Sequence, residues 1–131
     1  MPEAGVYKVL VVDDSVSVVD YLKHVISRRP QFKLIVAYNA EDCLSLVELE
    51  SPDIVLLDIN LPQMNGLEAC KRIRASHPTL PVIIVTAELD PAERFNAYQA
   101  GANDFITKPF NAEQIITHIR HHLHLSSIDV R

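Results

Sequence analysis

The chain has 131 residues, of which 48% are apolar and 22% are charged, a balance typical of a soluble globular protein. Its length suits one domain with a substantial core. The formal net charge of -5 argues against direct binding of nucleic acid, and no apolar run approaches the roughly 20 residues that a membrane span requires. There is no signal-peptide pattern, and Cys43 and Cys70 lack CxxC spacing. We therefore expect a cytoplasmic protein with two reduced thiols and no membrane partner.

Five short apolar segments recur along the chain, and each is apolar at consecutive positions. They cover residues 7–12, 32–37, 54–57, 82–86 and 105–107. Consecutive apolar residues, without alternation, are typical of strands that are buried on both faces. We therefore predict five buried strands.

Segments with helical periodicity follow these strands. Each begins at a recognisable capping or first-turn residue, namely Ser15, Asn39, Asn65-Gly66, Pro91 and Asn111. The predicted inward faces include Val18, Leu22, Val25 and Ile26; Cys43, Leu44 and Val47; Leu67, Cys70 and Ile73; and Ile115, Ile116, Ile119 and Leu123. Five strands that alternate with five helices predict an α/β fold, a (βα)5 chain with a doubly wound parallel sheet.

Polar residues stand where four of the predicted strands end. Asp13 and Asp14 follow the first strand and Asp58 follows the third. Thr86 ends the fourth strand and Lys108 follows the fifth. Ligands of such sheets bind beyond the carboxyl ends of the strands, where the strand order reverses. The sequence therefore predicts one crevice that holds three carboxylates, a hydroxyl and an ammonium group.

Four motifs, "VVDDS", "DIVLLDINLPQMNG", "VIIVTAE" and "GANDFITKPF", occur in this order. With their spacing they resemble the receiver domains of response regulators, among them the stand-alone chemotaxis regulator. The resemblance runs from about residue 7 to about residue 125. It implies a flavodoxin-like strand order 2-1-3-4-5. We expect a receiver domain over residues 1–125, with residues 126–131 forming a tail or the start of a linker to an output domain.

The acidic residues raise the question of what balances their charge. Two like unit charges ~4 Å apart repel by about 4 kcal/mol at an effective dielectric constant of about 20. Oxygen ligands suit Mg²⁺, which would remove this repulsion. The resemblance implies that Asp14, Asp58 and the backbone carbonyl of Asn60 bind Mg²⁺ directly and that Asp13 does so through water. Taken alone, Asp13 and Asp14 could instead be solvent-exposed residues before a helix N-terminus, where the helix dipole stabilises negative charge.

A carboxylate can accept a phosphoryl group as an acyl phosphate. The resemblance implies that Asp58 accepts it from a histidine kinase or a phosphotransfer protein, and that Lys108 pairs with a phosphate oxygen. It also implies a cis bond between Lys108 and Pro109. Alone, Asp58 could be a turn residue and Lys108 a surface lysine.

The resemblance further implies a switch formed by Thr86 and Phe105, which changes the surface of the fourth helix, fifth strand and fifth helix. Phe105 lacks the hydroxyl of the tyrosine found in related domains, and an ordinary core position is its alternative. Asn60 and Glu88 are expected to tune hydrolysis of the acyl phosphate by orienting water, which predicts a short-lived phosphoryl group.

His118 and His122 are four residues apart and could hold a transition metal, although a solvated last helical turn is the favoured interpretation. Winged-helix regulators resemble one another in a basic residue where His118 stands. This departure weakens the case for their mode of dimerisation, although a phosphorylation-dependent homodimer stays possible.

The sequence bears on three classes of function. The favoured class is a phospho-switch in two-component signalling that controls a downstream protein or a linked output domain. A haloacid-dehalogenase-type hydrolase is disfavoured because its Asp-x-Asp-x-Thr motif is expected at the first strand, whereas here "DINLP" follows the third. A nucleotide- or flavin-binding module is disfavoured because the chain has three glycines and no GxGxxG.

Overall fold

Strands and helices alternate along the chain in the computed structural model, which describes residues 5–87 and 90–125. The strands are β1 (Tyr7–Val12), β2 (Phe32–Ala37), β3 (Ile54–Leu57), β4 (Val82–Thr86) and β5 (Asp104–Thr107). The helices are α1 (Val16–Ser27), α2 (Ala40–Glu50), α3 (Gly66–Ser76), α4 (Pro91–Gln99) and α5 (Ala112–His122). All paired strands are parallel, in the order β2-β1-β3-β4-β5, which confirms the predicted fold and strand order.

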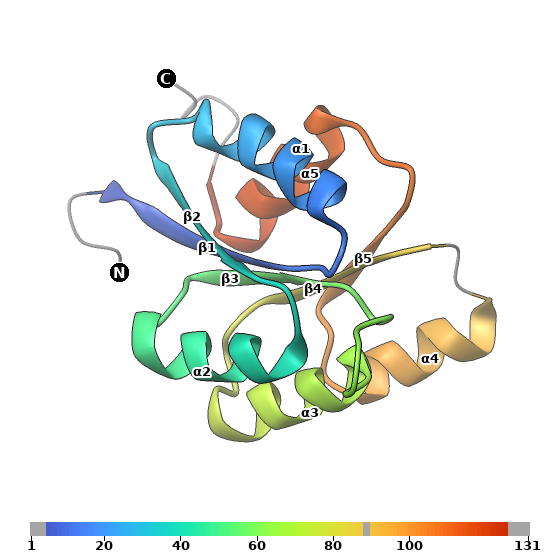
Figure 1. The fold of residues 1–131 in the computed structure, drawn as a ribbon. Coiled ribbons are helices and arrows are strands. Elements are labelled where there is room, and N and C mark those ends of the chain that lie inside the picture. The colour runs from blue at the N-terminus through green and yellow to red at the C-terminus, as the bar shows by residue number, and fades with distance from the viewer. Residues whose placement is uncertain (1–4, 88–89, 126–131) are drawn as a thin grey trace.

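The sheet lies between two layers of helices (Figure 1). Helices α1 and α5 cover one face, and α2, α3 and α4 cover the other. Successive side chains of a strand point to opposite faces, so Val9 and Val11 join the core under α1 and α5, whereas Leu10 and Val12 join the core under α2 and α3. This explains why β1 reads as a continuous apolar run.

The prediction that all five strands are buried on both faces is only partly confirmed. Every residue of the interior strands β3 and β4 is buried, whereas β1, which is also interior, begins with two half-buried residues. The outer strands β2 and β5 each pair along one side only and contain half-buried residues. Phe105 in β5 is one of these half-buried residues, and it packs against the hydrophobic core.

The predicted capping residues occupy the expected positions. The side chains of Ser15, Asn39, Asn65 and Asn111 accept hydrogen bonds from backbone N–H groups in the first turns of their helices. In α1 the inward residue is Val19, whereas Val18, which we had expected to be buried, is only partly covered. The longest described helix has 12 residues, and within the described ranges no helix has the length and apolar character to cross a membrane.

The two cysteines lie in the core between the sheet and helices α2 and α3. Both are free thiols and both are buried. Burial raises the pKa of Cys43 to about 12, with a smaller contribution from Cys70, and burial also raises the pKa of Cys70. Because the thiolate is the reactive form, both side chains are chemically inert packing groups at neutral pH.

Candidate functional site

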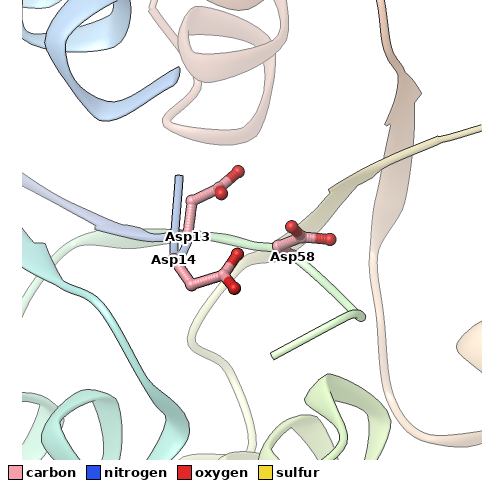
Figure 2. A group of neighbouring side chains, drawn as sticks. All are labelled: Asp13, Asp14 and Asp58. Atoms are coloured by element: carbon pink, nitrogen blue, oxygen red, sulfur yellow. The ribbon is translucent and has the colours of Figure 1, made fainter. Parts of the chain in front are cut away.

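The pairing of β1 with β3 brings the acidic residues together. Val12 and Leu57 are partners in the register of the two strands, and the next residues of each strand carry the carboxylates. The N–H of Asp58 donates to the carbonyl of Val12 at 2.9 Å, which continues the pairing one residue further. Asp13, Asp14 and Asp58 therefore meet at one end of the sheet, as predicted (Figure 2).

The three carboxylates form a tight group of unequal exposure. One oxygen from each can be chosen so that all three atoms lie within 4.8 Å of one another. Asp13 is 2% exposed and Asp58 is 5% exposed, whereas Asp14 faces solvent. Short backbone hydrogen bonds orient the buried pair. Asp13 Oδ1 accepts from the N–H of Ser15 at 2.9 Å, and Asp58 Oδ1 accepts from the N–H of Asn60 at 3.1 Å.

Lys108 reaches this group from the end of β5. Its Nζ lies 2.9 Å from Asp13 Oδ2 and 3.2 Å from Asp58 Oδ2. The backbone N–H of Lys108 donates to the carbonyl of Thr86 at 2.7 Å, and the Lys108–Pro109 bond is cis, as expected. Lys108 therefore lies in the site and is not a free surface lysine.

The environment of Lys108 shifts its pKa. Burial lowers the pKa, but hydrogen bonds and charges from Asp13 and Asp58 outweigh this and raise it above the usual 10.5. The raised pKa of Lys108 therefore contributes stability that is fully present below pH 10.5 and is lost as the pH rises through the raised pKa. At neutral pH this lysine is an ammonium group.

The charges around the site do not balance. One ammonium faces three carboxylates, and a cluster of acidic oxygens at this spacing suits a hard divalent cation such as Mg²⁺. The donor set of three carboxylates at the strand ends therefore fits a magnesium ion. Asn60, whose backbone carbonyl was expected to contribute, lies two residues after Asp58 in the loop that leaves β3.

Thr86 and Phe105 lie on neighbouring strands at different degrees of burial. Thr86 is 2% exposed and is the last residue of β4, where it pairs with Thr107. Phe105 is half-buried and meets two side chains of α4. Its ring lies 5.8 Å from that of Tyr98 and 4.6 Å from the guanidinium carbon of Arg94.

Other predicted positions lie elsewhere. Glu88 falls outside the described residues. His118 and His122 lie on α5 and both contact Asp104, a residue that the sequence reasoning left out. The reasoning also missed Arg94, whose contact with Phe105 crosses from α4 to β5. The four-residue spacing places His118 and His122 on one face of α5. With β5 beside α5, this spacing could have indicated their contacts with Asp104.

The family model for the response regulator receiver domain matches residues 9–120, so the chain belongs to this family. The receiver domain is a component of two-component response regulators, and a phosphoacceptor role is general for the family.

Relatives of known name match along most of this chain. A protein-glutamate methylesterase/protein-glutamine glutaminase of Paramagnetospirillum magneticum is 43% identical over 78% of the chain. The alkaline phosphatase synthesis transcriptional regulatory protein PhoP of Bacillus subtilis is 33% identical over 92% of it. The matched parts cover 30% and 50% of those proteins, so the chain spans half of their length or less.

Solved structures show the same fold. A CheY-like receiver domain protein of Methanospirillum hungatei superposes with a TM-score of 0.86 at 27% identity, covering 91% of this chain and 94% of that one. The response regulator domain of Thermotoga maritima CheB gives a TM-score of 0.82 at 31% identity, covering 92% and 98% of the two chains.

Proposed function

We propose that Asp58 is the phosphoryl acceptor of this receiver domain. The observation that carries the proposal is the placement of Asp58, which is 5% exposed and whose carboxylate lies beside Lys108 and the two carboxylates that follow β1. Oδ1 is held by the N–H of Asn60 and Oδ2 by the ammonium of Lys108. A nucleophile whose orientation is fixed in this way loses little freedom in the transition state.

The reaction forms one bond and breaks another. A carboxylate oxygen of Asp58 attacks phosphorus of a phosphohistidine, the P–O bond forms, the P–N bond breaks, and the imidazole keeps the electron pair of that bond. Lys108 then moves its charge from Asp58 Oδ2 towards a phosphoryl oxygen. When held by Asp14, Asp58 and the carbonyl of Asn60, and by Asp13 through water, Mg²⁺ would supply charge that offsets repulsion between the carboxylates and the phosphoryl group.

The proposed readout passes through Thr86 and Phe105. Thr86 lies at the end of β4 beside the site, and Phe105 lies at the sheet edge against α4. Movement of the Thr86 hydroxyl towards the phosphoryl group would open space that the Phe105 ring fills. That movement would release the contacts of the ring with Arg94 and Tyr98 and alter the surface formed by α4, β5 and α5.

The proposed partners follow from this division of the molecule. A histidine kinase or phosphotransfer protein delivers the phosphoryl group to the end of the sheet that carries Asp58. A downstream protein, a linked output domain or a second copy of the chain reads the surface of α4, β5 and α5. Nucleic acid is not a proposed partner of this domain because its net charge is -5.

The test is intact-mass measurement after incubation with acetyl phosphate, with and without Mg²⁺. We expect the wild type to gain one phosphoryl group only with Mg²⁺, and Asp58→Asn to gain none. Asp53→Asn, which replaces a carboxylate at the opposite end of β3, is the matched control and should be modified like the wild type. Modification of Asp58→Asn at the wild-type rate would contradict the proposal.

Asn60 and Glu88 are proposed to set the lifetime of the acyl phosphate. The decay of the phosphorylated mass should slow in Asn60→Arg and in Glu88→Ala, because each change removes a group that can orient water. Decay rates equal to that of the wild type in both variants would refute this assignment.

A further inference from the structure

A second group of metal-binding residue types lies away from the acidic site, where α5 packs beside the edge strand β5. The Nε2 atoms of His122 and His118 lie 3.0 Å and 3.6 Å from the same oxygen, Oδ2 of Asp104. The exposed fraction of the side chain is 16% for His122, 31% for His118 and 29% for Asp104. The group is therefore partly shielded by protein and still reachable from solvent.

Hydrogen bonds orient Asp104 and His118 towards each other. Asp104 Oδ1 accepts from the N–H of Phe105 at 2.8 Å, which leaves Oδ2 facing the imidazoles. His118 Nδ1 lies 2.8 Å from the carbonyl oxygen of Gln114. A carbonyl oxygen can only accept, so Nδ1 carries a proton and donates it to this bond, while Nε2 points at Oδ2 of Asp104.

This arrangement directs Nε2 of His118 at an anionic oxygen. A lone pair that faces a carboxylate oxygen at 3.6 Å is repelled unless a proton or a cation lies between them. An imidazole whose other N–H donates to a backbone carbonyl is also the usual form of a metal-binding histidine, because that bond fixes the ring and the tautomer.

We propose that Asp104, His118 and His122 form a site for a transition-metal ion of the Zn²⁺ class. Two imidazoles and one carboxylate are typical ligands of Zn²⁺, whereas the all-oxygen group at Asp58 suits Mg²⁺. Bonds of ~2.0–2.2 Å in tetrahedral geometry place ligand atoms roughly 3.4 Å apart. The two imidazole contacts to Asp104 Oδ2, at 3.0 Å and 3.6 Å, lie on either side of that spacing.

Binding requires the two imidazoles to move. Within the described ranges, the acidic group is the one set of three in which every pair of ligand atoms lies within 4.8 Å. The imidazoles of His118 and His122 must therefore approach each other, and the direct hydrogen bond from His122 to Asp104 is exchanged for bonds to the ion. Three protein ligands leave the fourth tetrahedral position to water.

The location gives this site a consequence for the receiver. A bound ion would join α5 to β5, and Asp104 is fixed by the N–H of Phe105, the residue that meets Arg94 and Tyr98 of α4. The ion would thus stiffen the edge strand next to that ring.

The experiment measures Zn²⁺ binding to untagged protein by calorimetry, with excess Mg²⁺ present so that the acidic group does not contribute. His118→Gln, His122→Gln and Asp104→Asn should each weaken Zn²⁺ binding at least ~10-fold, since even loss of a residue that only orients a ligand costs that much. His24→Gln removes an imidazole from α1 and should bind like the wild type. Asp14→Asn should also bind like the wild type, which would separate this site from the acidic group.

Co²⁺ provides a second readout that does not depend on stability. Tetrahedral Co²⁺ absorbs strongly in the visible range, and the wild type should show these bands whereas the three ligand variants should lose them. Equal Zn²⁺ affinity in the ligand variants and the wild type would overturn the proposal. A fall in melting temperature in the ligand variants, without any effect of Zn²⁺ on the wild type, would also overturn it and leave an ion pair only.

Discussion

Gly66, the first residue of α3, has no room for a side chain. Its N–H donates to the carbonyl of Ile59 at 2.8 Å, which closes the loop after β3 tightly. A Cβ atom there would overlap the carbonyl oxygen of Asp58 and would lie 2.7 Å from the Cα of Ile59. The backbone that carries the proposed acceptor is thus packed directly against this glycine.

Gly66→Ala is expected to push the loop away from α3, since the nearest neighbours of the new Cβ are backbone atoms that cannot rotate aside. The free energy of unfolding should fall by ~1–3 kcal/mol, as for overpacked cores. Because the displaced segment includes Asp58 and Asn60, Mg²⁺ affinity should fall as well. Calorimetric titration and denaturant unfolding measure the two effects.

Gly101→Ala is the matched control for this change. Gly101 has φ +106 and its Cβ would lie 2.9 Å from Cγ of Arg74, so the variant should also be destabilised. Its position is remote from the carboxylates, so Mg²⁺ affinity should stay at the wild-type value. Equal loss of Mg²⁺ affinity in both variants would mean that the effect is general destabilisation.

Helices α4 and α5 differ in what holds them in place, although both begin with a capping box. The α4 helix has nine residues, of which only Ala97 is buried. In α5, Ile115, Ile116 and Ile119 are all buried. The stability of α4 therefore depends on its cap and on the contacts of Tyr98 and Arg94 with Phe105, which suits an element that moves in signalling.

Removal of the α4 cap should loosen that helix alone. Asp90→Ala loses the hydrogen bond to the N–H of Glu93, worth ~1 kcal/mol. Amide hydrogen exchange should then accelerate in α4 and stay unchanged in α3.

Asn111→Ala removes the same type of cap from α5 and is the control. Because α5 packs on the core, removal of its cap should lower the free energy of global unfolding by ~1 kcal/mol. If exchange in α4 were unaltered in Asp90→Ala, the cap would not be what holds the helix.

At the scale of the whole molecule, repulsion among the carboxylates of the acidic group lowers the free energy of unfolding. Three carboxylates lie within 4.8 Å of one another and Lys108 supplies one positive charge. A cation that binds only the folded state adds stability in proportion to the logarithm of its concentration. The metal-free and Mg²⁺-bound proteins should therefore respond in opposite ways to the loss of one carboxylate.

Asp14→Asn should raise stability without Mg²⁺, because it relieves repulsion at a solvent-exposed position, by up to ~1 kcal/mol. The same variant should lose most of the rise in melting temperature that Mg²⁺ produces in the wild type. Thermal unfolding across a Mg²⁺ series measures both effects. Asp20→Asn on the exposed face of α1 is the control, and a similar gain there would attribute the effect to net charge alone.

The sequence by itself determined the order of elements, the parallel sheet and the residues that end its strands. Apolar runs mark buried strands, and Asp13, Asp58 and Thr86 stand directly at their ends, so local patterning places them at one edge. The capping residues were also predictable, because a cap acts within one helical turn.

Only the tertiary structure decided which side chains meet across elements. The ion pairs of Lys108 with Asp13 and Asp58 join residues 95 and 50 positions apart, and no local pattern encodes their distance. The pairing of Asp104 with His118 and His122 depends on α5 packing beside the edge strand, and the Phe105 ring against Arg94 depends on α4 lying on the other side. Contacts of this kind result from the packing of whole elements, which fixes positions and orientations that residue spacing does not contain.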